Sequence, residues 1–256
     1  MTGRLITPGG ACLAILLGGC TAGPLSILDP AGPAGADIAH ISWVMIIGFG
    51  IVWAGVLILA AYAFMTRRRE AAPVRALVIG GGLIFPSVVV LALLVYGIQS
   101  GKRMLPMPTE EEIFRVDVTG HQWWWEVNHP EAQEPARLVN EMHIPAGVPV
   151  DVHISSQDVI HSFWAPRLGG KMDAIPGRVN VIRLQADQPG VYYGVCAEFC
   201  GNLHAHMHLE IHAHPPEELQ QQLAQAAREN LQAVPEASSA PAGRAARTAP
   251  DSEARP

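Results

Sequence analysis

The sequence predicts a hairpin of two membrane-spanning helices followed by an antiparallel β-sandwich, and two patterns support this fold class. Residues 41–65 and 76–98 contain no charged side chain. At about 1.5 Å per residue, each is long enough to cross the hydrocarbon core of a bilayer. Beyond residue 110, apolar residues instead recur at every second position, and proline and glycine turns separate the short segments. Many short strands at this spacing are typical of a sandwich.

The N-terminus has the pattern of a bacterial lipoprotein signal peptide. Arg4 precedes an apolar run, and the segment ends in Leu17-Gly-Gly-Cys20. We expect a signal peptide over residues 1–19, with cleavage before Cys20 and lipid on its sulfur. An ordinary signal peptide with an incidental cysteine is the alternative. Residues 20–40, rich in proline and glycine, predict a tether.

The loop between the two predicted helices sets their orientation. Four arginines lie in or at the end of this 66–75 segment: Arg67, Arg68, Arg69 and Arg75. The positive-inside rule places such a loop in the cytoplasm. The β-domain and both mature termini would then lie on the periplasmic side of a bacterial inner membrane. Glycines 80–82 and Pro86 are tolerated in the second helix where a neighbouring helix packs closely, which favours docking against a larger membrane subunit.

Period-two alternation locates the strands of the predicted β-domain, residues 101–214. Phe114, Val116 and Val118 share one face, and Val150, Val152 and Ile154 do the same further on. The predicted strands are 113–119, 122–127, 138–144, 150–155, 179–185, 191–195 and 207–212. A helix follows over 215–232, and the tail 233–256, rich in alanine, proline and charge, is predicted to be disordered.

A soft ligand set marks the end of the β-domain. Cys196, Cys200, His204 and Met207 lie within twelve residues, and His161 lies upstream. Thiolate, imidazole and thioether ligands favour copper over magnesium or calcium, and two cysteines four residues apart let two sulfurs bridge a pair of copper ions. A disulfide would close only a tiny loop, and methionine is a poor zinc ligand, but both remain alternatives on the residues alone.

Four motifs, in order, resemble subunit II of the haem–copper cytochrome c oxidases. They are Gly120–Trp125, Asp158–Trp164, Lys171–Arg178 and Cys196–Met207. The resemblance covers roughly residues 38–213. It implies a cupredoxin-like Greek-key barrel that holds a dinuclear copper-A centre.

The resemblance also assigns roles to single residues. Cys196 and Cys200 would bridge the two copper ions, His161 and His204 would each supply an imidazole, and Met207 would supply a thioether. The backbone carbonyl of Glu198 would complete this set. The Glu198 side chain would face a magnesium ion at the boundary with the catalytic subunit, because that ion prefers hard oxygen ligands.

Three consecutive tryptophans follow Gln122. Because neighbours on a strand point to opposite faces, Trp123 and Trp125 should share a face that Trp124 opposes. The resemblance assigns Trp123 as the residue where electrons enter from cytochrome c, and the family usually has tyrosine at position 124. Asp158 and neighbouring acids could meet the basic face of that cytochrome, with simple solubility as the alternative. We expect five further histidines at the surface: His129, His143, His153, His206 and His214.

The implied function is that of subunit II of an aa3-type cytochrome c oxidase, a respiratory oxidoreductase. The chain would accept single electrons from cytochrome c and pass them to haem in subunit I, where oxygen is reduced to water. The expected partners are oxidase subunits I and III and cytochrome c. Residues 101–216 carry a net charge of −6, which argues against a nucleic-acid partner and for a basic one.

Other functions are weighed against the same residues. A copper-A subunit of a related haem–copper nitric oxide reductase is the alternative. A quinol oxidase subunit would lack the copper ligands, and two membrane spans argue against a copper chaperone. No Cys-x-x-Cys-His occurs, so no c-type haem is attached to this sequence. Ile79 stands where many family members carry a glutamate near a proton-uptake path, so that role does not transfer to this chain.

Overall fold

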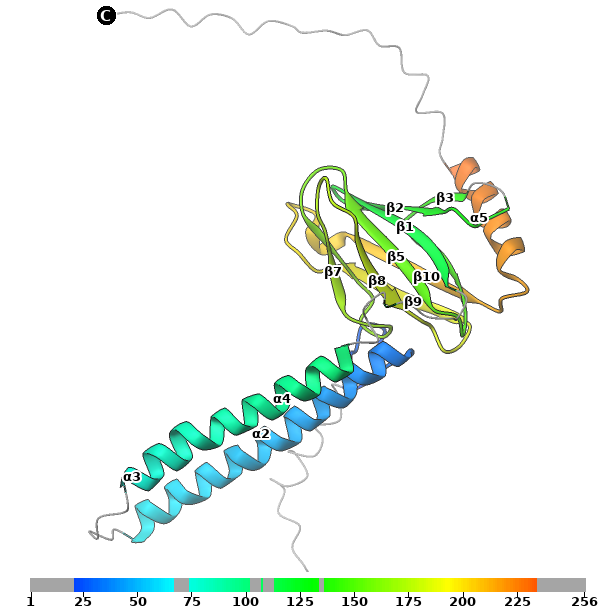
Figure 1. Cartoon of the computed structure of the whole chain (residues 1–256). Helices are drawn as coiled ribbons and strands as arrows, with labels where there is room; N and C mark the ends of the chain where they lie inside the picture. The colour runs from blue at the N-terminus through cyan, green and yellow to red at the C-terminus, as the bar shows by residue number, and fades with distance from the viewer. Residues whose placement is uncertain (1–20, 67–73, 102–106, 108–112, 134–135, 234–256) are drawn as a thin grey trace, which may run out of the picture.

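The computed structural model describes residues 21–66, 74–101, 107, 113–133 and 136–233 (Figure 1). The predicted signal peptide, the lipid site at Cys20, most of the arginine loop and the tail from residue 234 lie outside these residues. Within them, two long helices and a β-domain follow one another along the chain, as the sequence predicts.

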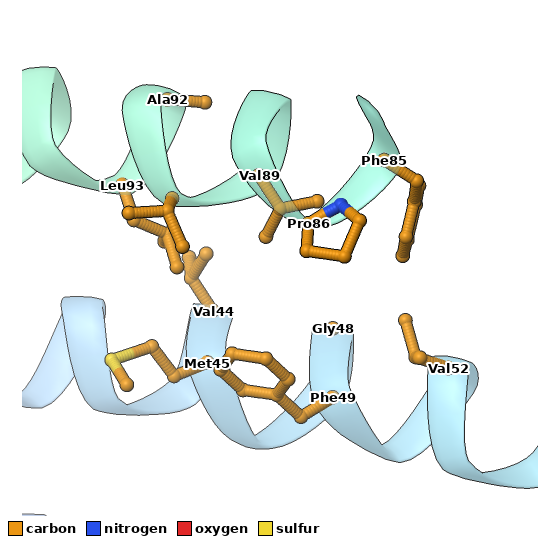
Figure 2. A pocket seen from close by; sticks show the side chains of 11 residues that line it. Val44, Met45, Gly48, Phe49, Val52, Phe85, Pro86, Val89, Ala92 and Leu93 are labelled. Atoms are coloured by element: carbon orange, nitrogen blue, oxygen red, sulfur yellow. The ribbon is translucent and has the colours of Figure 1, made fainter. Parts of the chain in front are cut away.

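The two long helices form a hairpin. Helix α2 spans Pro33–Thr66, and the second rod runs through α3 (Val74–Ala76), a π-helical segment (Leu77–Ile84) and α4 (Phe85–Gly101). Both rods are long and apolar enough to cross a membrane. The π-helical segment contains the glycine triplet and ends just before Pro86, which has no N–H group to continue the regular pattern. An apolar groove between α2 and α4 is lined by residues such as Phe49 and Pro86 (Figure 2).

The segment predicted as a tether is shorter than expected and is held against the β-domain. Helix α2 begins at Pro33, because proline fits the first turn of a helix without losing a hydrogen bond. Before it, the Ala31 amide donates to the Arg167 carbonyl at 2.8 Å, and the Asp187 amide donates to the Ala31 carbonyl at 2.9 Å. Arg167 also forms an ion pair with Asp29 at 3.1 Å. Residues 29–33 therefore connect the membrane helix directly to the sandwich.

The β-domain consists of two five-stranded sheets. One sheet has the order β3-β2-β1-β5-β8 and the other β4-β10-β9-β6-β7. The strands are β1 (Phe114–His121), β2 (Trp124–His129), β3 (Ala136–Val139), β4 (Glu141–Pro145), β5 (Val150–Ser156), β6 (His161–Trp164), β7 (Lys171–Ala174), β8 (Asn180–Leu184), β9 (Gly190–Cys196) and β10 (His208–His214). Most neighbours are antiparallel, but β1 pairs with β5, and β4 with β10, in parallel. The fold class is that of a cupredoxin-like sandwich, as predicted.

Two features of the sheets differ from the predicted strands. The single strand expected at 138–144 is two strands, β3 and β4, which belong to different sheets. Asn140 makes the crossing with a φ of 57°, and its side-chain oxygen accepts a hydrogen bond from the Trp125 amide at 2.7 Å. Strands β6 and β7 were not predicted. The first three residues of β6 are all buried, so the strand shows no alternation.

The core lies between the two sheets, where the alternating apolar residues meet. Val116, Val118, Val152 and Ile154 are fully buried there, on the faces that the alternation predicts. Helix α5 (Leu219–Ala233) covers one end of the sandwich and buries Leu219 and Leu223.

Candidate metal centre

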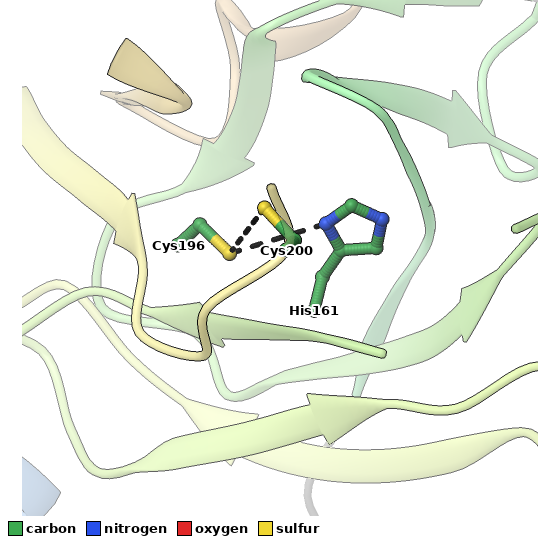
Figure 3. A group of neighbouring side chains, drawn as sticks. All are labelled: His161, Cys196 and Cys200. Carbon is green, nitrogen blue, oxygen red and sulfur yellow. Dashed lines mark hydrogen bonds between the residues drawn. The ribbon is translucent and has the colours of Figure 1, made fainter. Parts of the chain in front are cut away.

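The predicted ligands come from two adjacent strands and one loop. His161 is the first residue of β6, and Cys196 is the last residue of β9. These strands pair with Phe163 opposite Cys196, which brings the imidazole beside the thiol (Figure 3). Cys200 follows in the loop, His204 begins a 3-10 turn, and Met207 directly precedes β10. Strand pairing therefore brings together candidate ligands that are spread over 46 residues of sequence, from His161 to Met207.

The donor atoms form a tight group around the two sulfurs. The Sγ atoms of Cys196 and Cys200 lie 3.8 Å apart. The His161 Nδ1 atom is 4.0 Å from the Cys196 sulfur, and the His204 Nδ1 atom is 3.6 Å from the Cys200 sulfur. The Met207 sulfur lies 3.9 Å from Cys200, and the Glu198 carbonyl oxygen lies 3.3 Å from Cys196. Each sulfur thus has its own imidazole.

These separations fit metal coordination. Metal–donor bonds of about 2.0–2.3 Å place the donors of a tetrahedral ion about 3.3–3.8 Å apart. His161, Cys196 and Cys200 form a group whose donor atoms all lie within 4.8 Å of one another, and His204 is not part of that group. Both cysteines are free thiols, so the disulfide alternative is excluded in this structure. Thiolate, imidazole and thioether donors at these distances suit a soft metal ion such as copper.

The ligands differ in exposure. His161, Cys196, Cys200 and Met207 are buried, and Met207 lies on the core side beside Leu209, as the alternation predicts. The Glu198 side chain is exposed, while its carbonyl oxygen points to Cys196. The site therefore has a dry interior and one carboxylate on its outer surface.

Asp158 holds the imidazole of His161. Its carboxylate accepts a hydrogen bond from His161 Nε2 at 2.8 Å, and it also accepts from the backbone amides of Gln122 and Val159 at 2.7 and 2.6 Å. The proton on Nε2 leaves Nδ1 free to face Cys196, as metal-ligating histidines require. Sequence reasoning placed Asp158 at a docking surface and missed this contact, although the three-residue spacing to His161 was visible.

The charges of these groups are coupled. Burial alone would raise the pKa of Cys196, but hydrogen bonds with His161, with the backbone of Glu198 and Ser162, and with His204 together lower that pKa to about 6. Burial and the neighbouring Cys196 thiolate raise the pKa of Cys200 to about 12. Burial opposes charge on His161, yet Cys196 and Asp158 raise its pKa. In the metal-free site these shifts favour a thiolate at Cys196 and a thiol at Cys200.

The three tryptophans occupy different positions around the site. Trp123 lies in the turn before β2, and its indole N–H donates to the Cys200 carbonyl at 3.3 Å. Trp125 is fully buried and packs edge-on against His161 at 5.9 Å between ring centroids. Trp124 instead stacks on His121 at 4.2 Å. Trp123 and Trp125 thus both pack against the core on the metal side, and Trp124 lies apart.

Two neighbours of the site were not singled out from the sequence. The Gln122 side chain donates to the Cys200 carbonyl at 2.7 Å, next to Trp123. Gly120 packs against His161. A Cβ atom at position 120 would come within 2.8 Å of the imidazole Cδ2 atom, so a larger residue there would clash with the ring. Both belong to the aromatic motif, so their position in that motif was the available signal.

The expectation of surface histidines is wrong for His129 and His143. Both are buried. The His143 ring packs parallel to the rings of His212 and His214, and the His129 Nε2 atom accepts a hydrogen bond from the His143 amide. His206 is exposed as expected, and His153 and His214 are half-buried.

Comparison with known proteins finds similarity to one family. Residues 136–214 match the family model for the periplasmic domain of cytochrome c oxidase subunit II. The chain is 45% identical over 96 residues to cytochrome c oxidase subunit 2 of Alkalihalophilus pseudofirmus, covering 38% of this chain and 28% of the relative. It is 42% identical over 105 residues to the same subunit of Thermostichus vulcanus, covering 41% and 31%.

The matched regions thus span less than a third of the length of these relatives. Among solved structures, the periplasmic domain of subunit II of cytochrome oxidase from Bradyrhizobium japonicum is 29% identical, with a TM-score of 0.45, and the match covers 48% of this chain and 99% of that domain. Over residues 136–214 the chain is therefore similar to the periplasmic domain of cytochrome c oxidase subunit II.

Proposed function

We propose that the chain is the electron-accepting subunit II of an aa3-type cytochrome c oxidase and that its β-domain binds two copper ions. The observation that carries this proposal is the buried pair of sulfurs with one imidazole at each end. A single zinc or copper ion would not need His204 at a separate position. The similarity to cytochrome c oxidase subunit II supports copper as the metal.

The chain's own residues prepare the site for electron transfer. When bound, the copper pair would supply a carrier that takes up one electron at a time. The ligands are held by two paired strands, by Asp158 behind His161, and by donors from Gln122 and Trp123 to the Cys200 carbonyl. Fixed, buried ligands limit rearrangement when the charge of the site changes.

Electrons would enter through Trp123. Its indole is half-buried, and it touches the backbone of a copper ligand through the 3.3 Å hydrogen bond to Cys200. A large aromatic ring at the surface also provides contact area for a docking partner. Cytochrome c is the proposed donor, and haem in oxidase subunit I, assembled with subunit III, is the proposed acceptor.

The Glu198 side chain supports a second, separate role. Its carbonyl oxygen is directed to Cys196, whereas its exposed carboxylate is free to meet another subunit. A hard oxygen ligand at this place suits the magnesium ion proposed at the boundary with subunit I. Glu198→Gln should remove that ion from the assembled oxidase, as metal analysis would detect, and leave the copper ligands unchanged.

We place the chain in the bacterial inner membrane, with the β-domain on the periplasmic side. Two rods able to span a membrane and arginines in the connecting segment support this orientation. Lipid on Cys20 would anchor the mature N-terminus on the same side. Intact-mass measurement of the mature chain should show an acylated N-terminal Cys20, and an unmodified cysteine or cleavage elsewhere would contradict it. Cys20→Ala should block this processing while the helices keep the chain in the membrane.

The dinuclear site predicts two copper ions per chain and a mixed-valence spectrum with the electron shared between them. Cys196→Ser and Cys200→Ser should each abolish that spectrum, because each removes one of the two bridging sulfurs. Copper analysis and electron paramagnetic resonance of the purified chain provide the measurement. Glu198→Gln is the matched control in the same loop, since its backbone carbonyl remains. Binding of one copper ion, or preference for zinc when both are offered, would refute the dinuclear proposal.

The pKa directions at the site predict how copper uptake depends on pH. Cys196 already carries a thiolate at pH 7, whereas the raised pKa of Cys200 keeps it a thiol that copper must deprotonate. Copper affinity should therefore rise about tenfold per pH unit for each proton displaced. Competition titrations between pH 6 and pH 8 measure this slope. The exposed His206→Gln variant should keep the slope, and uptake independent of pH would contradict the assignment of a protonated Cys200.

The position of Trp123 predicts a variant that separates electron transfer from copper binding. Trp123→Phe should leave the copper spectrum intact but slow reduction by cytochrome c by about tenfold or more, equivalent to about 1.4 kcal/mol in the barrier. Stopped-flow reduction of the oxidase measures this rate. Trp124→Tyr is the control, because Trp124 stacks on His121 away from the ligands. Normal turnover of Trp123→Phe together with a slow Trp124→Phe would show that electrons enter elsewhere.

A further inference from the structure

A cluster of three histidines lies at the end of the sandwich opposite to the candidate metal centre. His129 is the last residue of β2 and His214 is the last residue of β10, and both of these strands begin next to the ligand loop. His143, on β4, contacts both of them. His129 and His143 are buried and His214 is half-buried. None of the three takes part in the proposed electron path.

The imidazole of His129 ties the two sheets together. Strand β4 is at the edge of its sheet and pairs only with β10. On the side without a partner strand, the backbone amide of His143 donates to His129 Nε2 at 3.0 Å. A buried amide that loses its acceptor is costly, and an imidazole nitrogen accepts a hydrogen bond only while it carries no proton. Protonation of Nε2 would therefore break this contact between the sheets.

A second bond closes the cluster on the side of β10. The Nδ1 atom of His143 lies 2.8 Å from His214 Nε2, and the Nε2 atom of His143 lies 2.9 Å from a Glu141 oxygen. Between the two imidazoles, one nitrogen must donate and the other must accept. The two rings therefore cannot both carry a second proton without losing the bond that joins β4 to the end of β10.

Helix α5 is held next to the same strands. It packs against β3 and β4. The Gln133 amide, in the loop that follows His129, donates to the Gln220 side chain of α5 at 3.0 Å. The helix also begins only five residues after His214. Loosening of β4 and of the ends of β2 and β10 would therefore remove the surface on which α5 rests.

Carboxylates face the cluster from several elements, and their negative charge favours protonated imidazoles. Glu141 raises the pKa of His143, and Glu218, just before α5, raises that of His214. The imidazole of His212, which stacks on His143, acts in the opposite direction on both. Two further titratable groups lie nearby: Glu210, which is 3.4 Å from His212, and Asp117, which lines the same pocket as His129.

Burial outweighs these carboxylates. Burial and the neighbouring His143 lower the pKa of His129 to about 4. Burial also lowers the pKa of His143, and together with the adjacent imidazoles it lowers that of His214 to about 4. A histidine freed from the cluster returns to its ordinary pKa of about 6.5. The stability that the closed cluster contributes is therefore complete above about pH 6.5 and is lost as the pH falls toward about 4.

We infer that His129, His143 and His214 form an acid-sensitive latch, which holds edge strand β4 and helix α5 on the sandwich at neutral pH and releases them in acid. The latch opens locally, because the apolar core between β1 and β5 contains none of these histidines. It is independent of the proposed copper centre, since no copper ligand belongs to it.

The test is amide hydrogen exchange of the full chain, read by mass spectrometry at pH 7 and pH 5 and corrected for the intrinsic pH dependence of exchange. Protection of β4 and α5 should fall at least about tenfold at pH 5, because the opened cluster takes up protons. Protection of β1 and β5 should not change. Equal protection of β4 and α5 at both pH values, or a uniform loss over the whole domain, would overturn the inference.

Variants that do not titrate identify the groups responsible. In His129→Gln the side-chain oxygen can still accept the His143 amide, and in His214→Gln the side-chain amide can still donate to His143 Nδ1. The double variant should therefore lose most of the difference between pH 7 and pH 5. His153→Gln, a half-buried histidine on β5 in the other sheet, is the matched control and should keep the full difference. A pH dependence that survives the double variant would contradict the latch, and failure of copper to form a dinuclear site would leave these exchange measurements unchanged.

Discussion

The pairing of β6 with β9 is the constraint on which the rest of the site depends. Phe163 lies opposite Cys196, and Trp164 lies opposite Val195. This register places His161, at the start of the short strand β6, beside a thiol that is 35 residues away in the sequence. Successive side chains on a strand point to opposite faces, so a slip of one residue would turn His161 away from the sulfurs. The other candidate ligands follow Cys196 within one loop, so the position of Cys196 also determines where they lie.

That loop is fixed from several directions. The Ala197 amide donates to the Ser162 carbonyl at 2.9 Å on β6, and the Cys196 amide donates to the Met207 carbonyl at 3.0 Å, which closes the loop at its base. From the other sheet, the side chains of Gln122 and Trp123 reach the Cys200 carbonyl. Both sheets therefore hold the ligand loop. Side chains held in this way keep their positions without a bound metal, so the candidate site is preorganised.

The sequence predicted the parts of this structure that depend on local pattern. Alternation located β1, β5 and β10 and their buried faces, and runs without charge located both membrane rods. Strand β6 was not predicted, because burial on both of its faces removes the alternation of apolar and polar residues. The change of sheet at Asn140 was not predicted either, because β3 and β4 follow one another in the sequence like a single strand. The ligands were predicted from motif resemblance, but the Asp158–His161 contact and the burial of His143 depend on strand neighbours that a single sequence does not reveal. Sequence propensity describes one segment at a time, whereas the Asp158–His161 contact and the burial of His143 depend on how several segments pack together.

The same reasoning explains why the segment before α2 matters to the site. Its contacts with Arg167 and Asp187 fall on loops of the sandwich, and Arg167 follows β6, the strand that carries His161, by three residues. The backbone approach is close: a Cβ atom on Gly32 would lie 1.9 Å from the Gln185 carbonyl oxygen. A flexible tether would not fix the position of the β-domain relative to helix α2. This short, hydrogen-bonded connection instead ties helix α2 to the sheet that carries His161 and Cys196.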